Sequence, residues 1–287
     1  IGAGRPDRVG PAVWQSLYLA GAFGLLFLLL IPLGPALVAW GGHDPAVQHE
    51  ERTYFAILCH ATLPTLIIAA ATSFLTGQGK NWPGMFVNSV GLAVNVLLDY
   101  GLIFGNLGLP ALGIAGAGWA TVLGNWAGAA VALALLFRRS QRALFATTNW
   151  RFNRALCARL LKFGVPSGLQ WALEGLAFTI FIMILGRMGT VELAASSITF
   201  TLNMVAVLPT PGIAHAVTTL VGQRLGENRP ELADRSTWRG FQAAWVYMAG
   251  MAVLYLFLPG WLLAIFESDN DPAQWPAVAE LATVLLR

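Results

Sequence analysis

Two acidic side chains lie inside long apolar stretches, and they are the first candidates for chemistry. Glu174 follows Gln170 by four residues, so a helix places both side chains on one face. A carboxylate beside an amide offers oxygen ligands to a cation, and burial favours the protonated carboxyl. Because an ionised side chain within a bilayer costs about 2.5–3.5 kcal/mol on insertion scales, we expect Glu174 to bind and release Na⁺ or H⁺. The alternative is an interhelical hydrogen bond that only fixes packing.

The second acidic residue, Asp99, belongs to a polar stripe. Asn88, Asn95 and Asp99 fall at i, i+7 and i+11, within about 20° of one helix face at 100° per residue. We expect this stripe to face the interior of the first half of a helical bundle, as part of a substrate cavity. Asp99 lies near the end of its apolar stretch, so anchoring neighbouring helix ends is the alternative.

A second polar stripe lies further along the chain, at positions i, i+3, i+7 and i+14. It comprises Ser196, Thr199, Asn203 and Thr210. We expect it to line a substrate cavity, with Asn203 as the leading candidate. Hydroxyl stripes also hold membrane helices together, which is the alternative. Pro209 and Pro211 predict a bend in the same helix.

The remaining reactive residue types form no known catalytic or metal-binding pattern. No spacing of His, Cys and acidic residues fits a metal centre, so we expect no cofactor other than the coupling ion. His60 and His215 stand alone and are expected to make helix contacts. The sequence also shows no Ser/His, His/Glu or twin-Asp pair that would indicate an enzyme. Two glycine pairs, Gly101/Gly105 and Gly124/Gly128, predict closely packed helices.

The elements that carry these residues are apolar and long. The 287 residues are 56% hydrophobic and 11% charged, whereas soluble domains carry about 25% charged residues. Apolar stretches exceed the roughly 20 residues that span a bilayer. We therefore predict an all-α, polytopic transmembrane bundle. Seven complete spans are expected at 13–40, 54–76, 83–105, 111–137, 163–185, 193–221 and 241–266, and an eighth begins near Pro276.

The basic residues set the predicted orientation. If the first segment is cytoplasmic, 14 of the 17 Lys and Arg residues fall in cytoplasmic segments. The outer loops are acidic instead, with Asp44, Glu50, Glu51, Glu267, Asp269 and Asp271. We expect a multi-pass protein of the inner membrane, in contact with lipid and not with nucleic acid, and monomeric.

A weak internal repeat divides the chain. Residues 1–7 (IGAGRPD) align with 225–231 (LGENRPE), and the same offset of 224 places Trp14 on Trp238. This predicts two parallel six-helix halves, of which the chain holds a part truncated at both ends. We assign 1–137 to the first lobe, 138–162 to a basic cytoplasmic loop and 163–287 to the second lobe.

Several segments resemble the multidrug and toxic compound extrusion family. They are 98–105 (LDYGLIFG), 108–121 (GLPALGIAGAGWAT), 162–170 (KFGVPSGLQ) with Glu174, and 218–226 (TTLVGQRLG). The resemblance implies twelve helices in two lobes around a central cavity. It also implies export of organic cations or other amphiphiles against Na⁺ or H⁺ entry, with the glutamate of the seventh helix, here Glu174, in cation coupling.

Three other classes compete with this interpretation. A lipid-linked oligosaccharide flippase shares the architecture but normally lines its cavity with cationic residues, which the complete spans lack. A seven-helix receptor fits the number of complete spans, although the repeat and the eighth apolar run argue against it. A membrane-embedded enzyme would need paired catalytic groups.

Overall fold

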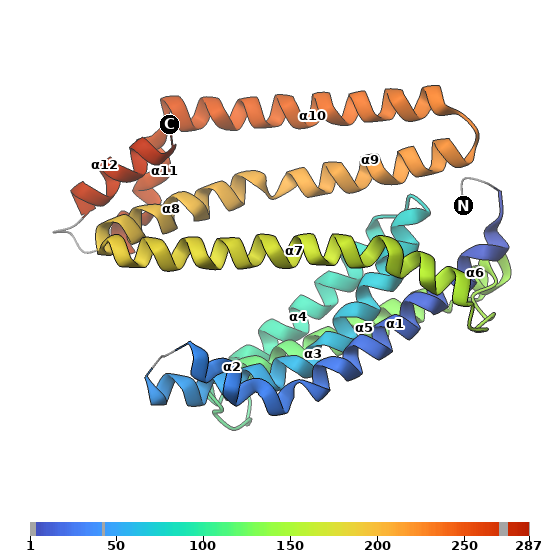
Figure 1. Cartoon of the computed structure of the whole chain (residues 1–287), viewed down its shortest axis with the longest axis horizontal. Helices are drawn as coiled ribbons and strands as arrows, with labels where there is room; N and C mark the ends of the chain where they lie inside the picture. The colour runs from blue at the N-terminus through green and yellow to red at the C-terminus, as the bar shows by residue number, and fades with distance from the viewer. Residues whose placement is uncertain (1–3, 42–43, 270–274, 287) are drawn as a thin grey trace. The chain divides into compact units, whose positions relative to one another are not determined.

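The computed structural model describes residues 4–41, 44–269 and 275–286. Within this part of the chain, all regular secondary structure is helical. The residues cluster into two compact units, Ile1–Leu161 and Lys162–Arg287, and Figure 1 shows the helices of each. The predicted outer-loop residue Asp271 and the terminal Arg287 lie outside the described residues.

Unit 1 is built on four long helices and several short ones. Their bounds are η1 Pro6–Arg8, α1 Val9–Leu29, η2 Ile31–Leu33, α2 Gly34–Trp40, α3 Pro45–Gly77, α4 Trp82–Phe104, α5 Ile114–Leu136 and α6 Arg139–Phe145. Helix α5 packs extensively against both α3 and α4, and α1 packs against α3. The small buried side chains Ala71, Val87 and Ala132 form one core where α3, α4 and α5 meet. Close helix approach therefore organises this unit.

Glycines allow that approach at the α4–α5 contact. A Cβ on Gly124 would lie 2.8 Å from the carbonyl oxygen of Gly91 and 2.8 Å from the Cβ of Asn95. The prediction that Gly124/Gly128 marks a packing surface is confirmed. Gly101 and Gly105 are also closely packed, but against the segment after α4 and not against another helix: a Cβ on Gly101 would lie 2.7 Å from Leu109 Cδ1, and one on Gly105 3.0 Å from Ala111 Cβ. Gly105 has a φ of +74° and ends α4, with its N–H donating to the Gly101 carbonyl.

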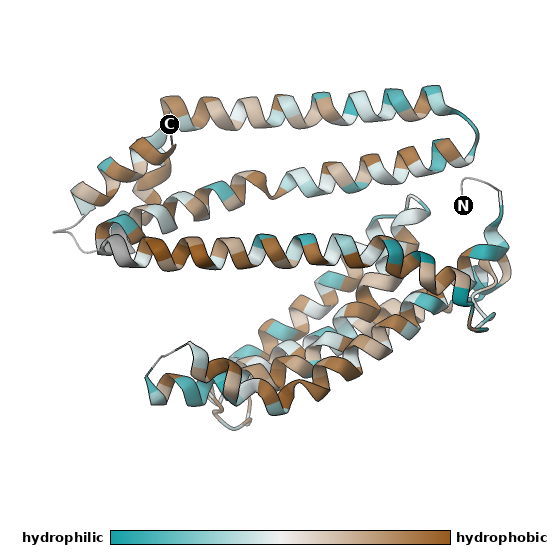
Figure 2. Ribbon diagram, viewed as in Figure 1, coloured by the Kyte–Doolittle hydropathy of each residue, from teal (hydrophilic) through white to brown (hydrophobic). Residues whose placement is uncertain are grey.

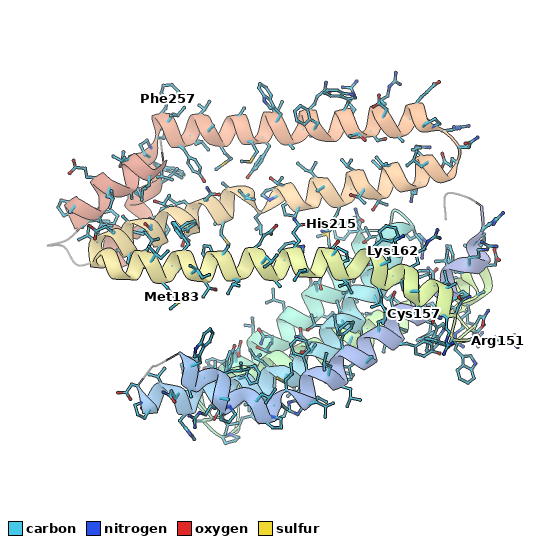
Figure 3. The ribbon with its side chains drawn as sticks, in the orientation of Figure 1. Arg151, Cys157, Lys162, Met183, His215 and Phe257 are labelled. Atoms are coloured by element: carbon cyan, nitrogen blue, oxygen red, sulfur yellow. The ribbon has the colours of Figure 1, made fainter. Side chains whose placement is uncertain are left out.

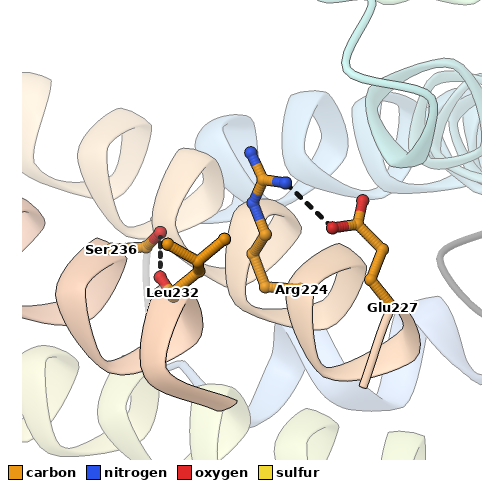
Figure 4. Close-up of polar contacts among 4 residues, drawn as sticks. All are labelled: Arg224, Glu227, Leu232 and Ser236. Carbon is orange, nitrogen blue, oxygen red and sulfur yellow. Dashed lines mark hydrogen bonds and ion pairs between the residues drawn. The ribbon is translucent and has the colours of Figure 1, made fainter. Parts of the chain in front are cut away.

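Unit 2 continues from the first turns of α7. It holds α7 (Arg154–Met188) from Lys162 onward, followed by α8 Thr190–Val207, α9 Pro209–Gly226, α10 Pro230–Phe257, α11 Pro259–Leu263, η3 Ala264–Asp269 and α12 Trp275–Leu286. Its buried core joins α8 to α11 and α12 through Ala195, Ile198, Leu263, Val278 and Ala282. Helices α9 and α10 lie side by side and antiparallel. At their connection, Arg224 pairs with Glu227 at 2.8 Å, and Ser236 donates to the Leu232 carbonyl, as Figure 4 shows.

The predicted number of spans is confirmed. Seven helical segments in the described residues are long and apolar enough to cross a membrane, and Figure 2 shows hydrophobic residues along them. The bend predicted from Pro209 is present, because α8 ends at Val207 and α9 begins at Pro209. The sequence repeat aligns Pro6 with Pro230, and each of these prolines begins a helix.

The predicted bounds of one span are wrong. The span expected at 241–266 is a helix from Pro230 to Phe257, followed by the separate elements α11 and η3. Pro259 has no N–H and its ring crowds the preceding turn, so α10 cannot continue through it. The residues on both sides of this break are apolar, so hydrophobicity alone did not reveal the end of the helix.

The predicted basic loop at 138–162 is shorter than expected. Helix α6 begins at Arg139 and α7 at Arg154, so only Arg138 and residues 146–153 of this segment are non-helical. We call residues 146–153 the connector. The Asn153 side chain accepts a hydrogen bond from the Leu156 N–H at 3.1 Å, which caps the first turn of α7. Basic composition marked this segment as cytoplasmic but did not distinguish helix from loop.

Candidate functional site

The predicted pair on α7 forms a direct contact. The Gln170 amide Nε2 donates to the Glu174 carboxylate Oε1 at 2.9 Å. The i, i+4 spacing therefore placed both groups correctly on one face. Both residues are exposed, and they line a shallow depression along α7 together with Pro166, Leu169, Leu173 and Ala177. The expectation that Glu174 is buried is not met within unit 2.

This arrangement leaves most of the carboxylate available. One oxygen of Glu174 accepts from Gln170, so the other oxygen and the Gln170 carbonyl oxygen remain as potential ligands. No group of three His, Cys, Asp or Glu side chains gathers anywhere in the described residues. A proton needs only the carboxylate, whereas a metal cation needs further oxygen ligands. The pair is therefore sufficient for proton binding and is a partial site for Na⁺.

A proline interrupts α7 one turn before this pair. Pro166 lies inside the helix and has no N–H, so the Lys162 carbonyl loses its partner four residues ahead. Gly164 and Gly168 flank the proline, and a Cβ on either would meet nothing within 4 Å. The boundary between the two units falls between Leu161 and Lys162. The helix is thus weakest where it passes from one unit to the other.

The polar stripe on α4 does not face the bundle interior as a whole. Asn95 lies against Gly124 of α5, and Asp99 is half-buried, but Asn88 is exposed. Because the three positions share one face to within about 20° at 100° per residue, the difference in exposure lies along the length of α4 and not around it. An interior position agrees with the structure for Asn95, whereas Asn88 is exposed within unit 1, and the cavity role of the stripe stays a prediction.

The stripe on α8 and α9 also separates into different environments. Ser196 is buried, and the Thr199 hydroxyl donates to the Ala195 carbonyl at 2.8 Å. The Thr210 hydroxyl lies 3.9 Å from the Met248 sulfur on α10. Asn203 is exposed on α8. Ser196 is therefore a packing residue and Thr210 lies against α10, whereas the Thr199 hydroxyl is bound within its own helix and Asn203 keeps an exposed amide. The cavity role predicted for Thr199 and Asn203 stays a prediction.

The histidines and cysteines of the spans differ in their surroundings. The His60 ring nitrogen Nδ1 lies 3.0 Å from the Ala56 carbonyl, and the ring packs against Trp119 with centroids 5.7 Å apart. His215 is exposed on α9 (Figure 3). Cys59 is buried and Cys157 half-buried, and neither forms a disulfide. The helix contact predicted for His60 is confirmed.

Two groups of polar residues were not identified from the sequence. Glu267 and Glu280 line a pocket of about 270 Å³ with Trp275 and Thr283. Glu280 is an acidic residue in the apolar run that begins at Pro276. It was visible in the sequence, but we interpreted that run only as an incomplete span. The other group is centred on Gln15, the single amide side chain in the apolar stretch 9–41. Its contacts are described below.

These features define a multi-pass α-helical membrane protein, and comparison with known proteins identifies its family. The MatE family model matches residues 1–101 and 166–287. The chain belongs to the MatE family of membrane transporters.

Curated relatives carry a consistent description. The chain is 26% identical to the probable multidrug resistance protein NorM of Thermotoga maritima, with 94% of this chain and 58% of the relative covered. It is 30% identical to the protein of that description in Xanthomonas axonopodis pv. citri, with 100% of this chain and 62% of the relative covered. The chain thus spans about 60% of the length of these relatives.

Solved structures share the fold. A MATE protein in complex with MaL6 matches with a TM-score of 0.86 at 19% identity, covering 99% of this chain and 64% of that one. A MOP superfamily transporter from Pyrococcus furiosus matches with a TM-score of 0.85 at 20% identity, covering 100% of this chain and 62% of that one. The predicted all-α, MATE-like fold is confirmed.

Proposed function

We propose that this chain forms part of a secondary efflux transporter that exports amphiphilic or cationic small molecules in exchange for Na⁺ or H⁺. The single observation that carries the coupling step is the Gln170–Glu174 pair, a carboxylate and an amide in direct contact on an apolar helix. Membership in the MatE family and the description of the NorM relatives as multidrug resistance proteins support export of small molecules.

The proposed mechanism is alternating access between two lobes. Cation binding at Glu174 neutralises its charge and favours the outward-open state, in which the substrate leaves. Release of the cation into the cytoplasm then leaves Glu174 free to bind the next one. A ligand shifts such an equilibrium only by binding one state more tightly than the other. The exposed amide of Asn203 and the half-buried Asn95 and Asp99 are the proposed substrate-contacting groups.

The remaining parts of the proposal concern the oligomeric state and the location of the protein. The protein acts as a monomer in the inner membrane, with its basic segments in the cytoplasm. Arg138, Arg139 and Arg142 at α6 and Arg151 in the connector belong to these basic segments. An excess of Lys and Arg on the cytoplasmic side is the general pattern of membrane proteins.

Ethidium efflux from reconstituted vesicles tests the function. The chain is reconstituted alone and as a chimera with the flanking segments of the longer Xanthomonas relative, and Na⁺ or pH gradients are imposed. We expect the gradient to drive efflux in the chimera and Glu174→Gln to reduce coupled efflux at least about tenfold, because a neutral amide neither binds nor releases a proton. Glu231→Gln, which removes an exposed charge from the first turn of α10, is the matched control.

Two outcomes contradict the proposal. Undiminished gradient-driven efflux in Glu174→Gln removes the coupling role from this residue. Efflux that ignores both gradients, or transport of a lipid-linked oligosaccharide in place of ethidium, removes the antiport function and favours the flippase class.

A further inference from the structure

The connector between α6 and α7 is bound to the first turns of α1. Three side chains of α1, at consecutive or i+4 positions, reach main-chain groups of the connector. The Trp14 indole Nε1 donates to the Thr147 carbonyl at 2.8 Å, and the Tyr18 hydroxyl donates to the Trp150 carbonyl. All of these residues lie in unit 1. The connector is therefore held along its length by one helix.

Gln15 makes the central contact. Its amide Nε2 donates to the Arg151 carbonyl at 3.1 Å, and its Oε1 accepts from the Asn153 N–H at 3.1 Å. The side-chain amide thus both donates to and accepts from the connector backbone, as the peptide group of a neighbouring strand does in a β-sheet. Nε2 also donates to the Pro11 carbonyl at 3.0 Å. Gln15 is fully buried, so losing these bonds leaves buried polar groups unpaired.

The contact extends to the start of α7. Asn153, whose N–H is bound by Gln15, also caps α7 by accepting from the Leu156 N–H. Figure 3 labels Arg151 in the connector and Cys157 and Lys162 on the first turns of α7. A single chain of hydrogen bonds therefore joins α1, through Gln15 and Asn153, to the first turn of the helix that carries Glu174.

We propose that Gln15 is a positioning residue for transport: it makes the connector and the first turns of α7 part of unit 1, so that movement between the units occurs within α7 beyond Leu161. This inference rests on the proposed alternating-access function. A long non-helical connector would ordinarily absorb such movement. Here the connector is bound to α1 and cannot absorb it. The next place along the chain where helical hydrogen bonding is interrupted is the turn before Pro166, where the Lys162 carbonyl lacks its helical partner.

Hydrogen exchange tests the fastening without reference to transport. Gln15→Met keeps a side chain of similar length but removes every hydrogen bond. We expect the Asn153 and Leu156 amides to exchange about tenfold faster in this variant, while amides in the middle of α5 are unchanged. Gln78→Met is the control, because it removes the Gln78–Gln141 amide pair, which does not touch the connector. Tyr18→Phe removes one bond at a half-buried position and serves as a milder second variant.

Transport kinetics test the positioning role. In the vesicle assay, Gln15→Met is expected to lower the maximal efflux rate about tenfold while the half-saturating ethidium concentration stays the same, because Gln15 touches no proposed substrate group. Tyr18→Phe is expected to show a smaller change of the same kind, and Gln78→Met none.

The outcomes separate this proposal from the proposed function. If wild type shows no coupled efflux, the transport function fails while the exchange data still decide whether Gln15 fastens the connector. If Gln15→Met and Tyr18→Phe leave exchange at Asn153 and Leu156 as in wild type, the fastening is wrong. If exchange rises equally throughout unit 1, or efflux is unchanged despite a loosened connector, Gln15 is merely structural and the positioning role is overturned.

Discussion

Gly10 of α1 lies directly against the end of α6 at Ala146. A Cβ on Gly10 would come within 2.4 Å of the Ala146 carbonyl oxygen and equally close to that of Phe145. These are backbone atoms, which cannot rotate away as a side chain can. This close approach brings the first turns of α1 alongside the start of the connector, next to the contacts of Trp14 and Gln15.

Gly10→Ala is therefore expected to destabilise unit 1. The added methyl forces α1 and α6 apart, and such overpacking costs about 1–3 kcal/mol. The melting temperature of the purified chain in detergent should fall. Gly21→Ala in the same helix is the control, because a Cβ there meets nothing within 4 Å. An equal melting temperature for Gly10→Ala and wild type would contradict the observed contact.

Ala146→Gly is expected to have the opposite effect. Ala146 ends α6 with a φ of +49°, in the left-handed region. That conformation costs a residue with a Cβ about 1–2 kcal/mol, whereas glycine adopts it freely but loses more entropy on folding. We expect a net gain of about 0.5–1 kcal/mol, seen as a higher melting temperature. Ala143→Gly, inside α6, should instead lower stability.

Thr147→Val tests an unpaired polar group in the connector. The Thr147 side chain is buried, and its hydroxyl oxygen has no hydrogen-bond partner among the described residues. Valine has nearly the same shape and no hydroxyl, so the desolvation cost disappears. We expect a gain of about 1 kcal/mol in unfolding free energy, while Thr148→Val, at an exposed position, gives none. A loss of stability in Thr147→Val would show that the hydroxyl is bound.

The sequence predicted the number of spans well because a bilayer imposes a minimum length on each apolar run. It predicted the Gln170–Glu174 contact for a similar reason, since four-residue spacing on any helix brings two side chains together. It did not predict the different exposure of Asn88 and Asn95, because helical spacing defines a face but not how much of its length a neighbouring helix covers. It also missed the role of Gln15, whose partners are main-chain groups of residues far along the chain and leave no pattern of residue types.

Gly124→Ala tests the close packing of α4 and α5. The added Cβ would lie 2.8 Å from the Gly91 carbonyl oxygen. In membranes, small residues at such contacts let backbones approach and pack. We expect a loss of about 1–3 kcal/mol, measured as a lower melting temperature in detergent. Gly250→Ala on α10 should not destabilise, since its Cβ meets nothing within 4 Å and alanine is the better helix former.

Gln170→Leu is expected to reveal which cation is coupled. The Gln170 Nε2 donates to the Glu174 carboxylate, and the Gln170 carbonyl oxygen is a potential ligand for a metal cation. With H⁺ as the coupling ion, loss of this contact changes the pH dependence of ethidium efflux and leaves its Na⁺ dependence unchanged. With Na⁺, loss of an oxygen ligand weakens binding, so half-maximal efflux needs more Na⁺. Because the pair is exposed, a rise of about three- to tenfold in the half-maximal Na⁺ concentration is expected in that case.

The measurement is the initial rate of efflux in chimera vesicles, titrated separately with Na⁺ and with pH. Gln242→Leu, an exposed amide on α10, is the matched control and should shift neither titration. A shift in one titration alone identifies the ion, because the two cations use different atoms of Gln170. If neither titration moves while efflux remains coupled, the amide takes no part in ion binding, and its contact with Glu174 only stabilises the helix.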